Sequence, residues 1–401
     1  QKNPPPADNF VAKYFQNGQL LERGKEKNAG DPWRPLKGVL IPAAFFHLVW
    51  WAYMIKFDLF YVFEEKYYMS FVMIFGSLIA GATSEGGGSV AFPVMTLAFD
   101  VDPVVARDVS FMIQSCGMSA ATFTIFYMGV KVERNAFIFC ALGGLFGIVL
   151  GLEQISTRMS SAQKKIGFVS IWFAFAFSLY WLNRNEARHV HLTVQNFPGK
   201  LYWRALVLIL TGFIGGIFSS VAGSGLDIYT FATLTLLFRV SEKVATPTSV
   251  CLMSTNSIIG IGWRIFFQRS VDMESWEFIA VTMPVVVLGA PFGSVLGSYC
   301  HRLVLAAFVY STDTVQLVAA YIIVNNQGNL DNKLIVTGGL CTVFGAIFFT
   351  AGSYLGLFIL ETTDLDRTDP DNPDGDNADM DRYWKMKNEK NLKMENNVLA
   401  V

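Results

Sequence analysis

Long apolar runs alternate with short polar connections between Val39 and Leu360. A helix needs about 20 mainly apolar residues to cross a bilayer, and several of these runs reach that length. The pattern therefore predicts an all-α polytopic membrane protein. The apolar runs cover residues 39–63, 70–99, 104–129, 136–153, 166–182, 205–221, 225–238, 244–265, 276–298, 303–324 and 334–360.

The two ends of the chain are polar. Residues 1–38 form a polar N-terminal tail, and residues 361–401 form an acidic and then mixed-charge tail, which we expect to be disordered. The aspartates after residue 368 are spaced somewhat like a calcium-binding loop. An EF-hand loop carries Glu at its twelfth position, whereas the twelfth residue counted from Asp369 is Met380, so we predict no calcium site there.

Composition supports a membrane protein, since 52% of the residues are hydrophobic and only 16% are charged. Soluble domains usually contain about 25% charged residues. The net charge of −1 gives no basic excess that would indicate a nucleic-acid partner. The five cysteines form no CxxC pair, so the sequence predicts neither a disulfide framework nor a zinc site. We expect no metal and no cofactor.

An internal duplication organises the apolar region. Gly, Thr, Phe and Ser residues recur at an offset of 139, and the motif L-G-x-x-F-G-x-V-L-G occurs at Leu142–Gly151 and again at Leu288–Gly297. Matches of this kind in one register predict two homologous repeats. The predicted organisation is an extra transmembrane helix at 39–63, repeat 1 at 69–182, a loop at 183–204, repeat 2 at 205–324 and a last transmembrane helix at 334–360.

Each repeat opens with an apolar segment that small residues interrupt. The interruptions are ATSEGGGS, from Ala82 to Ser89, and SSVAGSG, from Ser219 to Gly225. Each Gly disfavours a helix by about 1 kcal/mol, so we expect the helix to unwind there. Unwound backbone is tolerated within a membrane only where it faces protein or water. If the segment turns back on itself, each repeat crosses the membrane three times and the second repeat is inverted, as in many transporters.

The sequence around these interruptions resembles the TauE/SafE sulfite-exporter family of membrane permeases. The resemblance lies in EGGGSVAFPVMTL and in the paired segments VARDVSFMIQS and VATPTSVCLMS, and it covers about residues 69–324. It implies a polytopic carrier that moves small sulfur-containing oxyanions, such as sulfite or organosulfonates, usually outward. The implied partners are a small anionic solute and the lipid bilayer.

An oxyanion needs hydrogen-bond donors and positive potential, and the N-terminus of a helix supplies both. We therefore predict a substrate site where the two interruptions face each other near the membrane midplane, completed by polar side chains of the helix that follows each one. The alternative is that the small residues only allow close helix packing. The predicted substrate-binding residues are Gly86, Gly87, Gly88, Ser89, Ser110, Gln114, Ser115, Ser224, Gly225, Thr248, Ser249, Ser254 and Asn256.

Three carboxyl groups stand out within the predicted spans, where an ionisable side chain costs about 2.5–3.5 kcal/mol on insertion scales. Glu85 and Asp227 lie at the interruptions, and each could bind a coupled proton or sodium ion or could cap a helix N-terminus. Repeat symmetry suggests that they share one role. Asp313 lies in mid-span and is either a third coupling residue or a hydrogen-bond partner of a nearby hydroxyl. Arg107 lies at the end of a span, where snorkelling to the membrane surface is the default expectation.

These observations favour a secondary carrier over other classes of protein. The chain shows no metal triad, nucleophile elbow or phosphate loop, so we predict that it is not an enzyme. A channel with the same broken helices, or a structural membrane subunit, remains an alternative. The sequence leaves open the host membrane, the substrate, the coupling ion and whether the protein forms a homo-oligomer.

Overall fold

The computed structural model describes residues 33–83, 85–183, 193–197, 201–299, 302–326 and 331–362. Most of both predicted tails and most of the predicted loop at 183–204 lie outside the described residues. The regular elements within the described ranges are helical. Their bounds are α3 (Arg34–Phe57), α4 (Val62–Ala82), α5 (Gly86–Pro93), α6 (Pro103–Met128), α7 (Arg134–Leu150), α8 (Ser161–Asn183), α9 (Leu201–Ala222), α10 (Leu226–Ala232), α11 (Glu242–Gly262), α12 (Met273–Tyr299), α13 (Arg302–Asn326) and α14 (Asn332–Thr362).

Seven of the described helices are long and apolar enough to cross a membrane. Many large apolar side chains remain exposed on the outside of the bundle, for example Leu48 at 72% and Phe75 at 70%. An apolar surface of this extent indicates contact with lipid. The all-helical architecture and the membrane-spanning helices agree with the polytopic protein that the apolar runs predict.

The order of elements recurs along the chain. The same series of elements runs from α4 to α8 and again from α9 to α13. It consists of a long helix, a break, a short helix that continues into a π-helical turn, and three long helices. The π-helical turns are η2 (Val94–Ala98) and η6 (Thr233–Leu237). This order follows the duplicated sequence, while the inverted orientation of the second copy stays a prediction.

The first helix of each predicted repeat packs against the third long helix of the other, because α4 contacts α12 and α9 contacts α7. The glycines of the duplicated motif lie in these contacts. A Cβ on Gly147 would collide with the backbone of Phe213, and a Cβ on Gly293 would collide with the backbone of Leu78. Small residues at such positions let membrane helices approach closely, which explains why the motif occurs twice.

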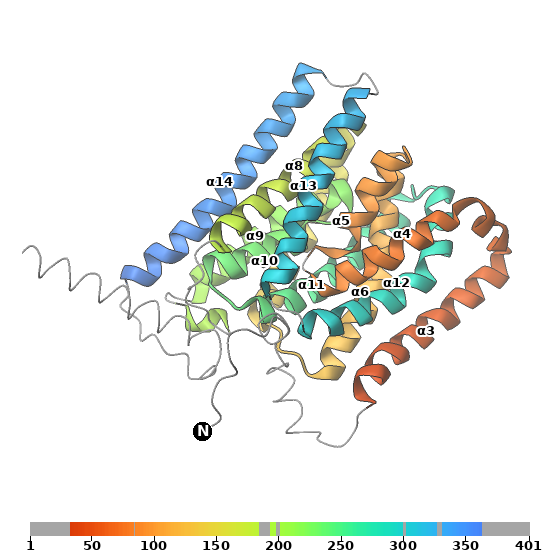
Figure 1. Cartoon of the computed structure of the whole chain (residues 1–401), viewed down its shortest axis with the longest axis horizontal. Helices are drawn as coiled ribbons and strands as arrows, with labels where there is room; N and C mark the ends of the chain where they lie inside the picture. Colours follow the sequence, from red (N-terminus) through yellow and green to blue (C-terminus); the bar gives the residue numbers. More distant parts are fainter. Residues whose placement is uncertain are drawn as a thin grey trace, which may run out of the picture.

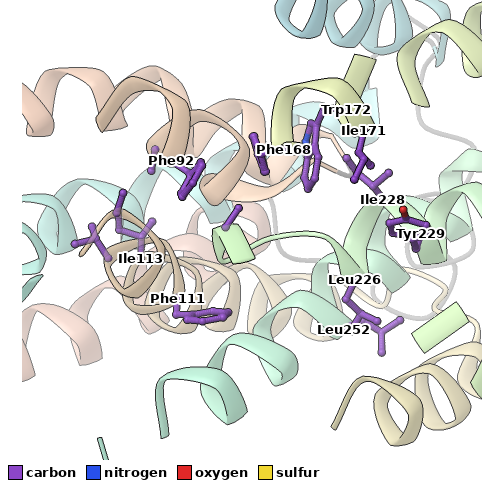
Figure 2. Packing of buried hydrophobic residues seen from close by; sticks show 14 of the residues in the cluster. Phe92, Phe111, Ile113, Phe168, Ile171, Trp172, Leu226, Ile228, Tyr229 and Leu252 are labelled. Carbon is purple, nitrogen blue, oxygen red and sulfur yellow. The ribbon is translucent and has the colours of Figure 1, made fainter. Parts of the chain in front are cut away.

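Helices α3 and α14 lie at opposite edges of the bundle, and the short helices α5 and α10 lie between them (Figure 1). Figure 2 shows the apolar packing around the short helices, where Phe92 of α5 lies beside Phe168 of α8, and Ile228 and Tyr229 belong to α10. The rings of Phe92 and Phe168 have centroids 5.1 Å apart. The packed core therefore encloses both short helices.

Candidate functional site

The first break lies between α4 and α5. Helix α4 ends at Ala82, Thr83 is extended with ψ at 178°, and α5 begins at Gly86 with Glu85 as its N-cap residue. Gly86 has a φ of +73°, a conformation that favours glycine. The predicted interruption is therefore present, but it comes just before the glycine triplet, and Gly87 and Gly88 are helical.

Among the described residues, no side chain caps the N-terminus of α5. The first N–H groups of a helix have no acceptor within the helix, so those at Gly86, Gly87 and Gly88 are available to another partner. This end of α5 also carries the positive pole of the helix dipole. The first break therefore supplies donors of the kind that an oxyanion requires.

The second break lies between α9 and α10, and its donors are already used. Gly223 has a φ of +85°, and Gly225 is the N-cap residue of α10. The Gly225 N–H donates to Asp227 Oδ1 over 2.7 Å, and the Leu226 N–H donates to Ser219 Oγ over 3.0 Å. The buried carboxylate of Asp227 therefore occupies the position that an external anion would take.

The two breaks face each other. Ser224 Oγ donates to the Glu85 carbonyl oxygen over 3.3 Å and to Asp227 Oδ2 over 2.7 Å. A Cβ placed on Gly86 would lie 3.1 Å from Asp227 Oδ2, and a Cβ placed on Gly88 would lie 3.0 Å from the Cβ of Ser224. Residues of the two repeats thus meet at one place inside the bundle.

Helix α6 contributes Gln114 and Ser110 to this place. Gln114 Nε2 donates to the Gly223 carbonyl oxygen over 3.1 Å, and Gln114 Oε1 accepts from Ser257 Oγ over 3.1 Å. A Cβ on Gly88 would collide with the Gln114 amide and would lie 3.3 Å from the Cβ of Ser110. Gly88 therefore faces the meeting point of the breaks. A Cβ on Gly87 would instead meet Ile113, so Gly87 faces apolar packing.

The carboxyl groups of Asp313 and Asp227 both lie close enough to the carboxyl group of Glu85 to act on it electrostatically. All three side chains are buried. Among the described residues, Glu85 Oε1 and both oxygens of Asp313 receive no hydrogen bond from a donor group of another side chain or of the backbone. Two carboxyl groups in contact repel each other unless one of them carries a proton. In the part of the chain that the structure describes, no group of three or more His, Cys, Asp and Glu residues is arranged to hold a metal ion.

The expectation that Glu85 and Asp227 share one role by repeat symmetry is not supported by their positions. Under the offset of 139, Glu85 corresponds to Ser224, and Asp227 corresponds to Gly88. The two acids also differ in partners, since Asp227 accepts hydrogen bonds from Ser224 and Gly225. The geometry favours the capping interpretation for Asp227.

Several hydroxyl groups on the predicted list are bound to their own helix. In each case the hydroxyl donates to a carbonyl oxygen three or four residues earlier, over 2.6–2.8 Å, which uses its proton locally. Such a hydroxyl can still accept a hydrogen bond but does not offer its proton to an anion. These residues are Ser89, Ser110, Ser115, Thr248 and Ser249.

Thr248 and two further predicted residues, Ser254 and Asn256, face neighbouring helices. Thr248 Oγ1 accepts from the backbone N–H of Glu133 over 2.9 Å. Ser254 Oγ lies 2.8 Å from Ser119 Oγ, across the contact between α6 and α11. Asn256 Oδ1 is buried without a hydrogen-bond partner among the described residues, and a Cβ on Gly144 would lie 3.2 Å from it. Binding roles for these three residues stay predictions.

The sequence analysis missed a buried ion network beside the second break. Arg107 is 3% exposed and so does not snorkel to the surface as its position suggests. Its Nε and Nη2 donate to Asp108 Oδ1 over 3.0 and 2.8 Å, and Arg264 Nη2 donates to Asp108 Oδ2 over 2.6 Å. The only available signal was an adjacent Arg–Asp pair at the start of an apolar run.

Comparison with known proteins agrees with this architecture. The family model described as sulfite exporter TauE/SafE matches residues 69–315, from within α4 to within α13. Neither the curated proteins nor the solved structures contain a match to the chain. The matched range covers both breaks and more than half of the chain, so this integral membrane protein belongs to the TauE/SafE sulfite exporter family.

Proposed function

We propose that the protein is a secondary carrier for small sulfur-containing oxyanions, such as sulfite or organosulfonates, and that the anion binds at the N-terminus of α5. The family match supports transport across the membrane. The observation that carries the proposed site is the uncapped N-terminus of α5, which faces the second break inside the bundle. The alternative position at α10 is disfavoured because Asp227 already accepts from Gly225 there.

The glycines give this site its geometry. An anion must approach the backbone N–H groups closely, which a residue without a side chain permits. Gly88 is closely surrounded by Gln114, Ser224 and Ser110, so any added atom there would fill the space next to the donors. Gln114 is the polar side chain of α6 nearest to this position, and its amide can help to orient a bound oxyanion.

The Glu85–Asp313 pair is the proposed coupling group. It lies at the N-cap of α5, and a bound anion beside it is favoured when the pair holds a proton and is repelled when the pair is fully ionised. The anion and the proton should therefore move together. The pair also joins the first break to α13, so a change in its protonation would alter a contact between the two predicted repeats. In this proposal Glu85 carries the coupled proton, and Asp313 is the acceptor that protonated Glu85 faces.

Reconstitution into liposomes tests the proposal. Purified protein should exchange external labelled sulfite for internal unlabelled sulfite, and an excess of internal substrate should accelerate uptake, which a carrier shows and a channel does not. Methanesulfonate serves as the organosulfonate probe. Gly88→Ala should reduce the exchange rate by at least tenfold, because the new methyl group collides with the Gln114 amide.

Gly262→Ala on α11 is the matched control, because a Cβ there meets nothing within 4 Å. It should exchange sulfite at the wild-type rate. Flux without acceleration by internal substrate would favour a channel, and a protein that moves neither probe would favour a structural subunit. Normal exchange by Gly88→Ala would contradict the proposed position of the anion.

A further inference from the structure

A second group of basic side chains lies near the start of α6, apart from the α5 N-terminus. Arg107 on α6 and Arg264, in the π-helical turn η7 (Trp263–Gln268) that follows α11, donate to the carboxylate of Asp108. Lys164 on α8 lies close enough to interact with these groups electrostatically, and we call the four residues the Asp108 cluster. The exposed fractions are 3% for Arg107, 6% for Lys164, 7% for Arg264 and 1% for Asp108. The cluster thus holds three mostly buried cationic side chains and one buried carboxylate, and the exposed Asp102 offsets only part of the excess positive charge.

The hydrogen bonds of the cluster show which of its cations are already occupied. Arg264 uses all five of its N–H groups, which donate to Asp108, Gln268 and Ser270. An arginine with this set of partners has a structural role.

Arg107 is less fully occupied. It donates to Asp108 twice, to Ser156 Oγ over 2.9 Å and to the Ser220 carbonyl oxygen over 3.4 Å. A guanidinium has five N–H groups, so one at Nη2 remains available. Its bond to Ser220 also connects the cluster to α9, just before the second break.

Lys164 is the least engaged cation of the cluster. Its ammonium makes no hydrogen bond or ion pair within the described ranges, although Arg107, Arg264, Asp108 and Asp102 act on it electrostatically. The neighbouring Lys165 differs, because it forms an ion pair with Asp100 over 3.1 Å. Residues 157, 158, 160 and 161, in the connection before Lys164, are exposed, so the cluster lies directly beneath a surface that solutes can reach.

We infer that Lys164 and the remaining N–H of Arg107 bind a small oxyanion, which supplies the missing negative charge. The chemistry fits a doubly charged anion with several acceptor oxygens, provided either by a free solute such as sulfate or sulfite or by the phosphate of a lipid headgroup. Charge-assisted hydrogen bonds from Arg and Lys to such groups are the strong ones.

The cluster also lies close to the proposed substrate site. Ser110, whose Cβ faces Gly88, follows Arg107 by one helical turn of α6. An anion held by Arg107 and Lys164 would therefore lie about one turn of α6 away from the proposed site at the N-terminus of α5. Such a position suits a site that collects the anion before it is transported. Only this recruiting role rests on the proposed function, because oxyanion binding to the cluster does not require transport.

Equilibrium binding of labelled sulfate to the purified full-length protein in detergent tests the inference. Lys164→Gln should weaken sulfate binding by about tenfold or more, as expected for the loss of a charge-assisted contact. Lys164→Arg, which keeps the charge, should retain binding and thereby excludes misfolding as the cause. Lys165→Gln is the matched control and should bind sulfate as the wild type does, because Lys165 already pairs with Asp100.

Nanodiscs of phosphatidylcholine, with or without phosphatidylglycerol, distinguish the two sources. Sulfate affinity that is independent of phosphatidylglycerol identifies a site for a free solute, whereas competition by phosphatidylglycerol in the wild type that disappears in Lys164→Gln identifies a lipid phosphate. Either result supports the oxyanion site. Equal sulfate binding by the wild type and Lys164→Gln, or no sulfate binding by the wild type, would overturn it. Failure of sulfite transport would refute the carrier proposal but would leave this binding result unaffected.

Discussion

The two breaks occupy corresponding places in the duplicated sequence but differ in how their polar groups are satisfied. At the second break, Asp227 receives hydrogen bonds from Ser224 and Gly225, and Ser219 receives one from Leu226. At the first break, no described residue caps α5 with its side chain, and none donates a hydrogen bond to the buried Glu85 Oε1. The backbone donors of the second break are therefore satisfied by nearby side chains, whereas the N–H groups of α5 and the carboxyl group of Glu85 at the first break are not.

This difference shows that duplication does not imply equal roles. Ser224 stands in the second repeat where Glu85 stands in the first, and its hydroxyl contacts both the Glu85 carbonyl and Asp227. The second break therefore holds the first one in position. We expect substitutions at the second break to affect stability, and substitutions at the first break to affect transport.

The largest effect should come from Glu85→Gln. The glutamine amide can donate to Asp313 as a protonated Glu85 would, so the fold should persist while proton binding is lost. Accumulation of sulfite driven by a pH gradient should disappear, and sulfite exchange without a gradient should stay within about twofold of the wild-type rate, since the donors of α5 are unchanged. Both fluxes are measured in the same liposomes.

The exposed Glu64 of α4 provides a control, because Glu64→Gln should leave both fluxes intact. If Glu85→Gln reduced exchange and accumulation together, the carboxyl group would have a structural role at the first break, and the contrast between the two acids would fail.

Asp227→Ala should give the next largest effect, on stability. The substitution leaves the N–H of Gly225 buried without its acceptor, which costs about 1–3 kcal/mol, and it removes the shorter of the two hydrogen-bond contacts of the Ser224 hydroxyl. Thermal unfolding in detergent should occur at a clearly lower temperature. Asp227→Asn keeps one acceptor oxygen and should fall between Asp227→Ala and the wild type, and wild-type stability of Asp227→Ala would refute the cap.

Gly225→Ala should have a smaller effect of the same kind. The new Cβ would lie 2.9 Å from the Cβ of Phe218 and from the backbone nitrogen of Ser219, both in α9, so it disturbs packing. Overpacking of this type costs about 1–3 kcal/mol. The protein that remains folded should keep the wild-type KM for sulfite exchange. A raised KM with unchanged stability would instead place the anion at the second break.

The smallest effect should follow from Ser115→Ala. Ser115 lies on the predicted substrate list, but its hydroxyl donates to the carbonyl oxygen of Met112 and makes no hydrogen bond to either break. We expect a change in stability of less than about 0.5 kcal/mol and no change in KM. A KM raised by tenfold would show that the side chain turns toward the anion during transport.

Much of the fold followed from local patterns. The apolar runs marked the long helices, and the small-residue clusters marked both interruptions, because Gly and Ser weaken a helix wherever they accumulate. The sequence also identified Glu85, Asp227 and Asp313 as the unusual acids within the apolar region. Their burial follows from the same principle, since an acid in a membrane span faces the interior of the bundle.

The individual partners could not be predicted in this way. Asp108 and Arg264 are 156 residues apart, and only the packing of α11 against α6 brings them together. Whether Asp227 caps α10 or leaves its donors free depends on a side-chain rotamer rather than on residue type. Five of the predicted hydroxyls donate to a carbonyl oxygen of their own helix, because a Ser or Thr in a helix can bind its own backbone, an outcome that sequence spacing does not reveal.

The packing of the first helix of each repeat against a helix of the other repeat also affects how the protein is assembled during synthesis. Helix α4 packs against α12, which follows it by nearly 200 residues, so α4 must enter the membrane long before the helix that completes its packing exists. Until then the surface around Gly81, where even a Cβ would collide with the backbone of Ala290, has only lipid or insertion factors to cover it. Biogenesis of the first repeat therefore depends on the ribosome finishing the second.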